Sequence, residues 1–338
     1  MISLRDRYRG TLLGLAVGNA LGLPVESWPS AEIRRQYPRG IRDIRPDEVL
    51  LPWDDDLAQA VILAEAILEH DTMKNEDLAR RLMSWFVSNG RGMGGQTRAV
   101  INALHKGMMP SEAAKLVWER DGGQPAGNGA VMRCAPVAMR WPKDRKKLFE
   151  ETEQSALITH HDPRCAWSAF AVNLAVSEAL HGRTASIGSI AEVLGASGVG
   201  PHTLSAVRDV AGRTLDHLQL DGPTMGYTLK AMQAGLWCLE NSKDFEKCLV
   251  TVIQAGGDTD TNGAVAGAIL GALHGAEAIP VRWTARIRNA DQLVSLADRL
   301  LERATEAGEM TGDAHDSDRA TVAGPRSAAG DPQMKRPR

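Results

Sequence analysis

Glycine recurs at every fourth position near the start of this chain, at Gly10, Gly14, Gly18 and Gly22. Apolar residues at steps of three and four between these glycines predict a helix over residues 5–22. Residues four apart share one face of a helix, so the glycines form a stripe that lacks side chains. Such a stripe allows a second helix to approach closely.

The rest of the chain continues the helical pattern, without a convincing run of alternating apolar and polar residues. Short glycine and proline breaks separate the segments, which favours a compact all-α fold. Residues 27–52, punctuated by prolines, are predicted to be irregular. We predict further helices over residues 57–70, 76–89, 96–107, 111–119, 129–139, 144–157, 163–181, 186–194, 202–219, 225–240, 244–255, 260–275, 280–288 and 290–306.

The character of the chain changes near its C-terminus. From residue 308 onward it is rich in Gly, Ala, Asp, Ser, Pro and Arg and has no apolar periodicity. Such a segment buries too little apolar surface to fold. We predict one helical domain over residues 1–307 and a disordered tail over residues 308–338.

Composition limits the partners and the compartment. The net charge of −3 gives no reason to expect nucleic acid or a membrane surface as a partner. The apolar runs are too short to span a bilayer, and the N-terminus lacks the apolar core of a secretory signal. The four cysteines form no CxxC pair, which is typical of buried thiols in a reducing compartment. We expect a cytoplasmic protein, and a monomer is compatible with these features.

An acidic stretch, Gly256–Gly263, immediately precedes an apolar run that reads as a buried helix. It carries Asp258 and Asp260 with the hydroxyls of Thr259 and Thr261. One interpretation is a divalent cation, because carboxylate and hydroxyl oxygens suit Mg²⁺, Mn²⁺ or Ca²⁺. The other is an N-cap at Asp258 followed by solvated residues in the first turn. The stretch alone leaves both open.

A second acidic cluster, Asp54, Asp55 and Asp56, also precedes an apolar helix. Three adjacent carboxylates repel one another unless they are solvated or bind a cation. Two such clusters suggest that both helix starts point into a shared site. Five aspartates fit two metal ions about 3.5–4 Å apart better than one.

Two glycine-rich turns and two isolated polar residues are further candidates. Residues 90–97 and 125–133 each open a helix, where backbone N–H groups could hold a phosphate, although a plain connector or turn explains both. His160 could bind a ligand or be structural. Glu26 lies just beyond the first helix, where it could reach a cleft or simply be solvated.

In their order, these stretches resemble the ADP-ribosylglycohydrolase family, which includes the dinitrogenase reductase-activating glycohydrolase and related ADP-ribosylhydrolases. The resemblance covers roughly residues 5–300, and the Gly-Gly-Asp-Thr-Asp-Thr stretch is its most specific part. The matching segments are residues 9–26, 53–56, 127–129 with 132–133 and 135–136, 159–160, 226–227 with 234–237, 256–261, and 279–280 with Trp283.

The resemblance implies a compact, orthogonal multi-helix domain with a cleft that holds two divalent cations, Mg²⁺ or Mn²⁺. The implied metal ligands are Asp54, Asp55, Asp56, Asp258, Asp260 and Thr261. The implied catalytic residues are Glu26, Asp55, Asp56 and Asp260, with Glu26 acting as acid, base or gate. The implied substrate-binding residues are Gly95, Gly127, Asn128, Gly129 and His160.

The chain departs from the family pattern at four positions. The family usually has Thr-Asp-Asp-Thr where this chain has Asp54-Asp55-Asp56-Leu57. Asp54 can still bind a metal, with one more negative charge than threonine, whereas Leu57 cannot. Asn19 replaces a common Asp and Ala130 a common Ser, which removes polar support near the cleft.

The resemblance implies metal-dependent hydrolysis of the glycosidic bond at C1″ of ADP-ribose attached to a protein side chain, with arginine favoured. The two metals would fix the ribose through its 2″- and 3″-hydroxyls. One alternative is hydrolysis of another ADP-ribosyl or nucleotide small molecule. A second is a family member that binds ADP-ribose without turnover. The expected partner is an ADP-ribosylated protein or an ADP-ribose-containing small molecule.

Overall fold

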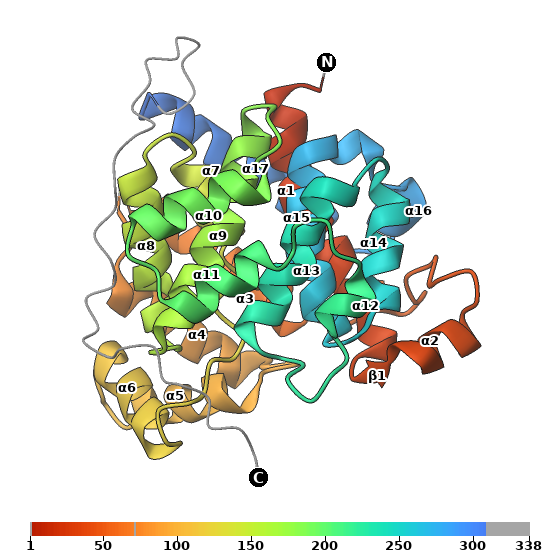
Figure 1. The fold of residues 1–338 in the computed structure, drawn as a ribbon. Helices are drawn as coiled ribbons and strands as arrows, with labels where there is room; N and C mark the ends of the chain where they lie inside the picture. The colour runs from red at the N-terminus through yellow and green to blue at the C-terminus, as the bar shows by residue number, and fades with distance from the viewer. Residues whose placement is uncertain (1, 71, 309–338) are drawn as a thin grey trace.

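A computed structural model of the chain describes residues 2–70 and 72–308, and apart from Gly308 the predicted tail lies outside the described residues. Figure 1 shows helices throughout this part. The helices are α1 Leu4–Gly22, α2 Ser30–Gln36, α3 Asp55–Glu69, α4 Asn75–Ser88, α5 Gly95–His105, α6 Pro110–Arg120, α7 Ala135–Arg140, α8 Arg145–Leu157, α9 Pro163–Leu180, α10 Ile187–Ala196, α11 Pro201–Arg208, α12 Leu215–Leu218, α13 Thr228–Asn241, α14 Phe245–Gln254, α15 Thr259–His274, α16 Val281–Thr284 and α17 Ala290–Glu306.

Short 3₁₀ turns and one strand pair complete the described elements. The turns are η1 Leu23–Val25, η2 Glu48–Leu50 and η3 Ala276–Ala278. The strands β1 Trp28–Pro29 and β2 Gly256–Gly257 pair antiparallel, with Trp28 opposite Gly257. The predicted all-α class is confirmed, and this two-residue pair ties the chain after α1 to the chain before α15.

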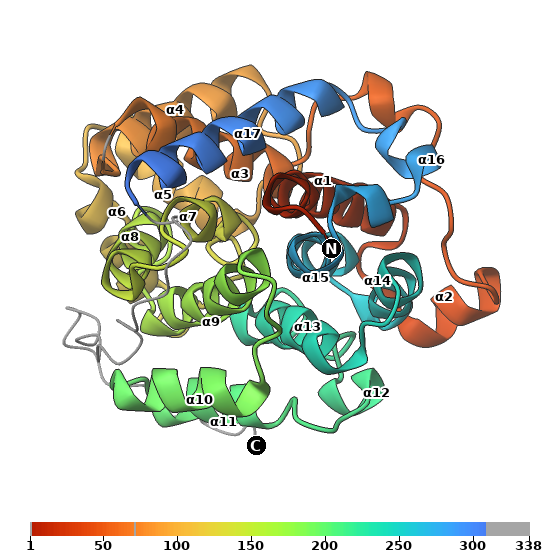
Figure 2. The same ribbon diagram turned by 90° about the horizontal axis from the view of Figure 1, so that it is seen from above.

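Helices α1 and α15 lie side by side at the centre of the fold (Figure 2). Helices α9, α13 and α14 pack against α15, while α3 and α17 pack against α1. Helices α10 and α11 form an outer layer over α9 and α13, and α4, α5 and α6 pack together on another side. The hydrophobic core extends through all these layers as one large cluster of buried side chains.

The close approach that the glycine stripe of α1 allows is made by α15. A Cβ atom on Gly10, Gly14 or Gly18 would overlap the carbonyl oxygen of Gly271, Gly267 or Gly263 in α15, respectively. At the fourth glycine, Gly22, a Cβ atom would overlap the carbonyl group of Thr259. The two backbones touch along their length because both helices lack side chains at the seam.

Four sequence predictions were wrong in their bounds. The predicted helix 202–219 is divided into α11 and α12 by a turn in which Gly212 has φ of +65°. The predicted helix 129–139 begins only at Ala135, as α7 Ala135–Arg140, and of residues 280–288 only Val281–Thr284 is a regular helix. Residues 27–52 are not wholly irregular, since they contain α2. This short helix buries only Ile33, so it lacks the apolar period that would reveal it.

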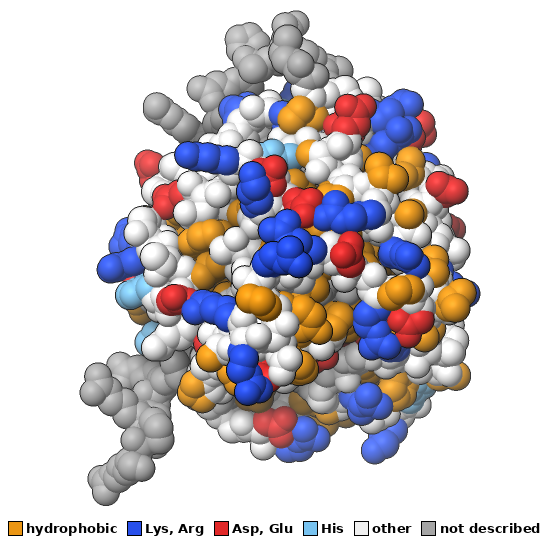
Figure 3. All heavy atoms as spheres, turned by 90° about the vertical axis from the view of Figure 1, so that its right-hand side faces the viewer, with side chains coloured by type: hydrophobic (Ala, Val, Ile, Leu, Met, Phe, Trp, Pro, Cys, Tyr) orange, Lys and Arg blue, Asp and Glu red, His pale blue; other side chains and the backbone are white. Residues whose placement is uncertain are grey.

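The structure also bears on the predictions for the cysteines and for membrane-spanning segments. All four cysteines are buried and free of disulfides, as predicted. No helix in the described ranges has the length and apolar character needed to cross a bilayer. On the face in Figure 3, basic and acidic side chains are interspersed. Ion pairs join several surface charges, and Arg282 pairs with both Glu246 and Asp43.

The glycine seam predicts a large difference between two chemically identical substitutions. Gly14→Ala places a Cβ atom against backbone that cannot move without separating α1 from α15, so we expect a loss of about 3 kcal/mol in the free energy of unfolding. Gly195→Ala in α10, whose nearest neighbour would be Leu204 Cδ2 at 3.8 Å, should be neutral or stabilise by up to about 1 kcal/mol. Urea unfolding measures the free energy of unfolding of both variants. Equal losses in the two would contradict the backbone contact between α1 and α15.

Candidate functional site

The site begins where two helices begin. Asp54 occupies the N-cap position of α3 and Asp258 that of α15, yet neither side chain forms the usual capping hydrogen bond to its helix. Asp260 and Thr261, in the first turn of α15, are each only 5% exposed. The alternative of a capping Asp258 followed by solvated residues therefore does not describe this helix start.

The two acidic stretches meet in space. Carboxylate oxygens of Glu26, Asp258 and Asp260 lie within 4.8 Å of one another, and those of Asp54, Asp55 and Asp56 do the same. The two groups are neighbours, because the charge of Asp258 contributes to raising the pKa of both Asp55 and Asp56. The structure thus brings six carboxylates into a single acidic site.

The acidic site holds more buried carboxylates than the neighbouring positive charges balance. Burial and the repulsion of Asp54 raise the pKa of Asp55 to about 8. Burial, followed by repulsion from neighbouring carboxylates, also raises the pKa of Asp56 and Asp260 well above the usual range. Asp56 Oδ1 and Asp260 Oδ1 have no hydrogen-bond partner. Unpaired, buried carboxylate oxygens are the donor set that hard divalent cations such as Mg²⁺ and Mn²⁺ prefer, so the residues fit such ions.

Two side chains that were not among the predicted metal ligands, catalytic residues or substrate-binding residues contact the acidic carboxylates. Asn19 Nδ2 lies 3.1 Å from Asp56 Oδ2 and 3.5 Å from Asp54 Oδ2. Arg91 Nε lies 3.6 Å from Asp54 Oδ1, and its Nη1 donates to Glu48 Oε1 at 2.8 Å. The sequence signal for Arg91 is its position as a positive charge within the glycine-rich turn of residues 90–97. The signal for Asn19 is its position as a polar residue within an otherwise apolar helix.

The second glycine-rich turn lies against the acidic site. Asn128 Nδ2 donates to Asp258 Oδ2 at 2.8 Å, and the Asn128 backbone N–H donates to Gly226 O at 3.1 Å. The Gly127 N–H donates to Gln96 Oε1 at 3.2 Å. Because both N–H groups are already bonded within the chain, the interpretation of this turn as an open phosphate cradle does not hold for Gly127 and Asn128.

The remaining predicted site residues surround that turn. His160 is 2% exposed, and a Cβ atom on Gly129 would lie 2.7 Å from its Cε1, so only glycine allows this packing. Gly95 is the first residue of α5 and has open space beside its Cα. Glu26 is exposed at the edge of the acidic site, and partial burial, with the charges of Asp258 and Asp54, raises its pKa.

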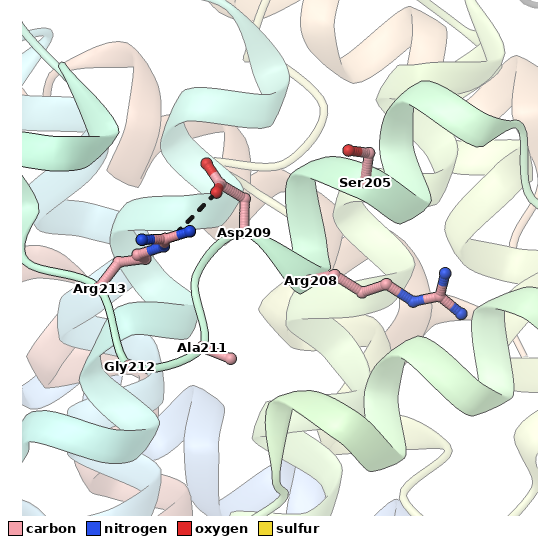
Figure 4. Close-up of a pocket in the computed structure, with 6 residues that line it drawn as sticks. All are labelled: Ser205, Arg208, Asp209, Ala211, Gly212 and Arg213. Carbon is pink, nitrogen blue, oxygen red and sulfur yellow. Dashed lines mark ion pairs between the residues drawn. The ribbon is translucent and has the colours of Figure 1, made fainter.

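A surface depression of about 350 Å³ lies at the end of α11 (Figure 4). Its polar lining includes Asp209, which pairs with Arg213 at 3.8 Å and with His217 at 3.1 Å. This carboxylate is exposed and already paired, unlike those of the acidic site. The depression therefore lacks the buried, unpaired oxygen donors that mark the acidic site.

Comparison with known proteins identifies similar chains. A sequence profile for the family described as ADP-ribosylglycohydrolase matches residues 1–309. The chain is 28% identical to the ADP-ribosyl-[dinitrogen reductase] glycohydrolase of Rhodospirillum rubrum, over 87% of this chain and 98% of that protein. It is 26% identical to the ADP-ribosylarginine hydrolase Tri1 of Serratia proteamaculans, over 89% of this chain and 80% of that protein.

A solved structure shares the fold. A chain of an "ADP-ribosylglycohydrolase-related protein complex" superimposes with a TM-score of 0.72 at 26% identity, covering 90% of this chain and all of that one. The family profile, which matches residues 1–309, includes both acidic helix starts and the turn between them.

The raised pKa values predict how pH and divalent cations act on stability. Asp55, Asp56 and Asp260 keep protons in the folded chain at pH values where the unfolded chain, with a carboxyl pKa of about 3.9, has released them. Without divalent cations, the free energy of unfolding should therefore fall as pH rises from about 4 to about 8. Mg²⁺ or Mn²⁺ at 100 times its dissociation constant should restore about 2.7 kcal/mol.

Thermal unfolding in EDTA and in added Mg²⁺ or Mn²⁺, at pH 5.5 and pH 8, tests this prediction. The increase in Tm on adding cation should be larger at pH 8. Asp55→Asn should raise the Tm of the EDTA-treated protein at pH 8 and shrink the increase. Asp209→Asn, at the exposed depression, should do neither. Equal cation effects at both pH values would contradict the prediction.

Proposed function

This chain belongs to the ADP-ribosylglycohydrolase family and is a glycohydrolase, and we propose that it removes ADP-ribose from modified arginine side chains of proteins by cleaving the glycosidic bond at C1″. The observation that carries the proposal is the meeting of the two acidic helix starts beside the Gly127–Gly129 turn. This arrangement places buried carboxylates next to a turn whose surface a sugar or phosphate group could contact. Arginine is favoured because one similar protein, of Serratia proteamaculans, is named an ADP-ribosylarginine hydrolase.

Two divalent cations, Mg²⁺ or Mn²⁺, would be held at the acidic site. Their ligands would be Asp55, Asp56, Asp258, Asp260 and Thr261, with Asp54 completing the set beside Arg91. Bound there, the ions would neutralise the carboxylates and supply Lewis-acid coordination for sugar hydroxyls. The unpaired oxygens Asp56 Oδ1 and Asp260 Oδ1 support this assignment.

The side chains of the acidic site would also act on the sugar directly. Cleavage at C1″ builds positive charge on the ribose, and carboxylates fixed before the reaction stabilise such charge without having to reorient. Asn128 holds Asp258 in place through the 2.8 Å hydrogen bond to its Oδ2. The carboxylates and the turn together would keep C1″ in a fixed position relative to the attacking water.

Glu26 would move the proton of that water. It is the exposed member of its carboxylate group, so water reaches it without crossing the buried aspartates. Its raised pKa brings it closer to neutrality, where a general base both accepts and releases protons efficiently. Glu26 would accept a proton as water attacks C1″ and return it to the departing guanidine nitrogen.

Release of ADP-ribose from arginine-modified and serine-modified protein tests the proposal. We expect release from the arginine-modified protein, its loss in EDTA and its recovery with Mg²⁺ or Mn²⁺. Asp260→Asn should lower kcat/KM at least about 1,000-fold, equivalent to about 4 kcal/mol of lost transition-state stabilisation. Asp209→Asn, the same change at the exposed depression, should leave the rate within twofold.

Two results would overturn the assignment. Full activity of the Asp260→Asn protein would remove the acidic site from the reaction. Release from neither protein, with hydrolysis of free ADP-ribosyl small molecules instead, would replace the protein substrate with a small one.

A further inference from the structure

We propose that Arg133 and Thr159 hold the ring proton of His160 on Nε2, so that His160 presents a neutral N–H donor to an oxygen of the ADP-ribosyl group beside the Gly127–Gly129 turn. Arg133 and Thr159 act here as positioning residues, through His160. The identity of the ligand rests on the proposed function, whereas the position of the proton rests on the geometry alone.

The chain of contacts starts at a buried guanidinium. Arg133 has no exposed surface, and its Nη1 donates to Gln59 Oε1 at 2.6 Å. Its Nη2 lies 2.8 Å from Ser155 O and 2.7 Å from Thr159 Oγ1. A guanidinium has donors only and stays charged in proteins, so Thr159 Oγ1 must accept from it.

The direction of the next hydrogen bond follows from that one. Thr159 Oγ1 has a single hydrogen, and His160 Nδ1 lies 2.8 Å away. The oxygen has a second lone pair, but Thr159 has no exposed surface and, among the described residues, its hydroxyl contacts no acceptor other than Nδ1. Its hydrogen therefore goes unpaired unless Nδ1 accepts it. In a neutral imidazole the proton must therefore be on the other nitrogen, Nε2. Burial, followed by the nearby charge of Arg133, lowers the pKa of His160 to about 3, so the ring stays neutral at ordinary pH.

The edge of the His160 ring that carries Nε2 faces the Gly127–Gly129 turn. A Cβ atom on Gly129 would lie 3.1 Å from His160 Nε2, and one on Gly127 would lie 3.4 Å from it. The glycines therefore leave room for Nε2 at the turn. Among the described residues, the only side-chain hydrogen bond of His160 is the one at Nδ1, so Nε2 has no partner within the chain. Nε2 is also not among the fully buried polar atoms without a partner, so it reaches open space although the residue as a whole is only 2% exposed.

An N–H donor that reaches open space and has no partner within the chain is available to a ligand, which replaces the water bonded to it. The acceptor must be small enough to reach the turn and must present an oxygen, which the ribose hydroxyls and phosphates of ADP-ribose provide. A neutral donor also binds such an oxygen without adding a titrating charge near the acidic site. His160 would thereby select for the ADP-ribosyl group rather than for the protein that carries it.

The matched pair Thr159→Val and Thr159→Ser tests the proposal. Valine keeps the shape of threonine and removes the hydroxyl, whereas serine keeps the hydroxyl. Long-range ¹H–¹⁵N NMR of histidine-labelled protein reports the ring tautomer, with His160→Gln used to assign the signal. We expect the Nε2–H form from pH 5 to 8.5 in the parent protein and in Thr159→Ser. In Thr159→Val we expect this preference to be lost.

Calorimetric binding of ADP-ribose to the same proteins, loaded with Mg²⁺ or Mn²⁺, supplies the second measurement. The dissociation constant should rise about tenfold in Thr159→Val and stay within twofold in Thr159→Ser. Thr152→Val is the control, because it removes an equally buried hydroxyl that bonds Leu148 O and Asn173. Its dissociation constant should also stay within twofold.

The outcomes separate this proposal from the proposed function. A parent protein with the proton on Nδ1, or a changed tautomer with unchanged ADP-ribose affinity, would overturn the role of Thr159 and His160. Failure of the parent protein to bind ADP-ribose would overturn the ligand. If the tautomer and affinity change together while no ADP-ribose is released from modified protein, the donor role stands and the hydrolytic function fails.

Discussion

The backbone contact between α1 and α15 is the constraint on which the site depends. Glycines on both helices let the two backbones touch along the whole seam, from Gly10 to Gly22. That contact fixes the end of α1 against the start of α15, where Gly22 meets Thr259 and the hydroxyl of Thr259 donates to Gly22 O at 2.9 Å. Glu26 follows four residues later and is thereby delivered beside Asp258 and Asp260. A seam spaced by larger side chains would separate these carboxylates.

Burial of like charges is the second constraint. The side chains around the acidic site compensate only part of the repulsion and lost solvation of its carboxylates. Asn19 and Arg91 contact Asp54 and Asp56, but oxygens of Asp56 and Asp260 remain unpaired. Asp54, Asp55, Asp56 and Asp260 are all buried, so water does little to solvate their carboxylates. Protons or divalent cations must therefore complete the charge balance, which makes stability and cation binding aspects of the same arrangement.

An uncharged surface lies beside the acidic site, and we call this surface, formed by Gly127, Gly129 and His160, the neutral wall. Gly127 and Gly129 allow the ring of His160 to lie against the turn, while Asn128 connects the same turn to Asp258. Behind the ring, the fully buried Arg133 bonds Gln59 of α3 and Thr159, so the wall is anchored to the helix that carries Asp55 and Asp56. The acidic site and the wall are consequently positioned by common elements.

The sequence by itself determined the helical class, the glycine stripe of α1 and the two acidic helix starts, because helix period and residue type are local properties. It did not reveal α2, which buries only Ile33, or the break between α11 and α12 at Gly212. The pair of acidic clusters already suggested a shared site, but the tertiary structure alone decided how the carboxylates group there, that Arg91 contacts Asp54, and that Asn19 contacts Asp54 and Asp56. It also decided that the N–H groups of Gly127 and Asn128 are used internally. These facts depend on contacts between residues far apart in the chain, and a pattern along one segment carries no record of its partner.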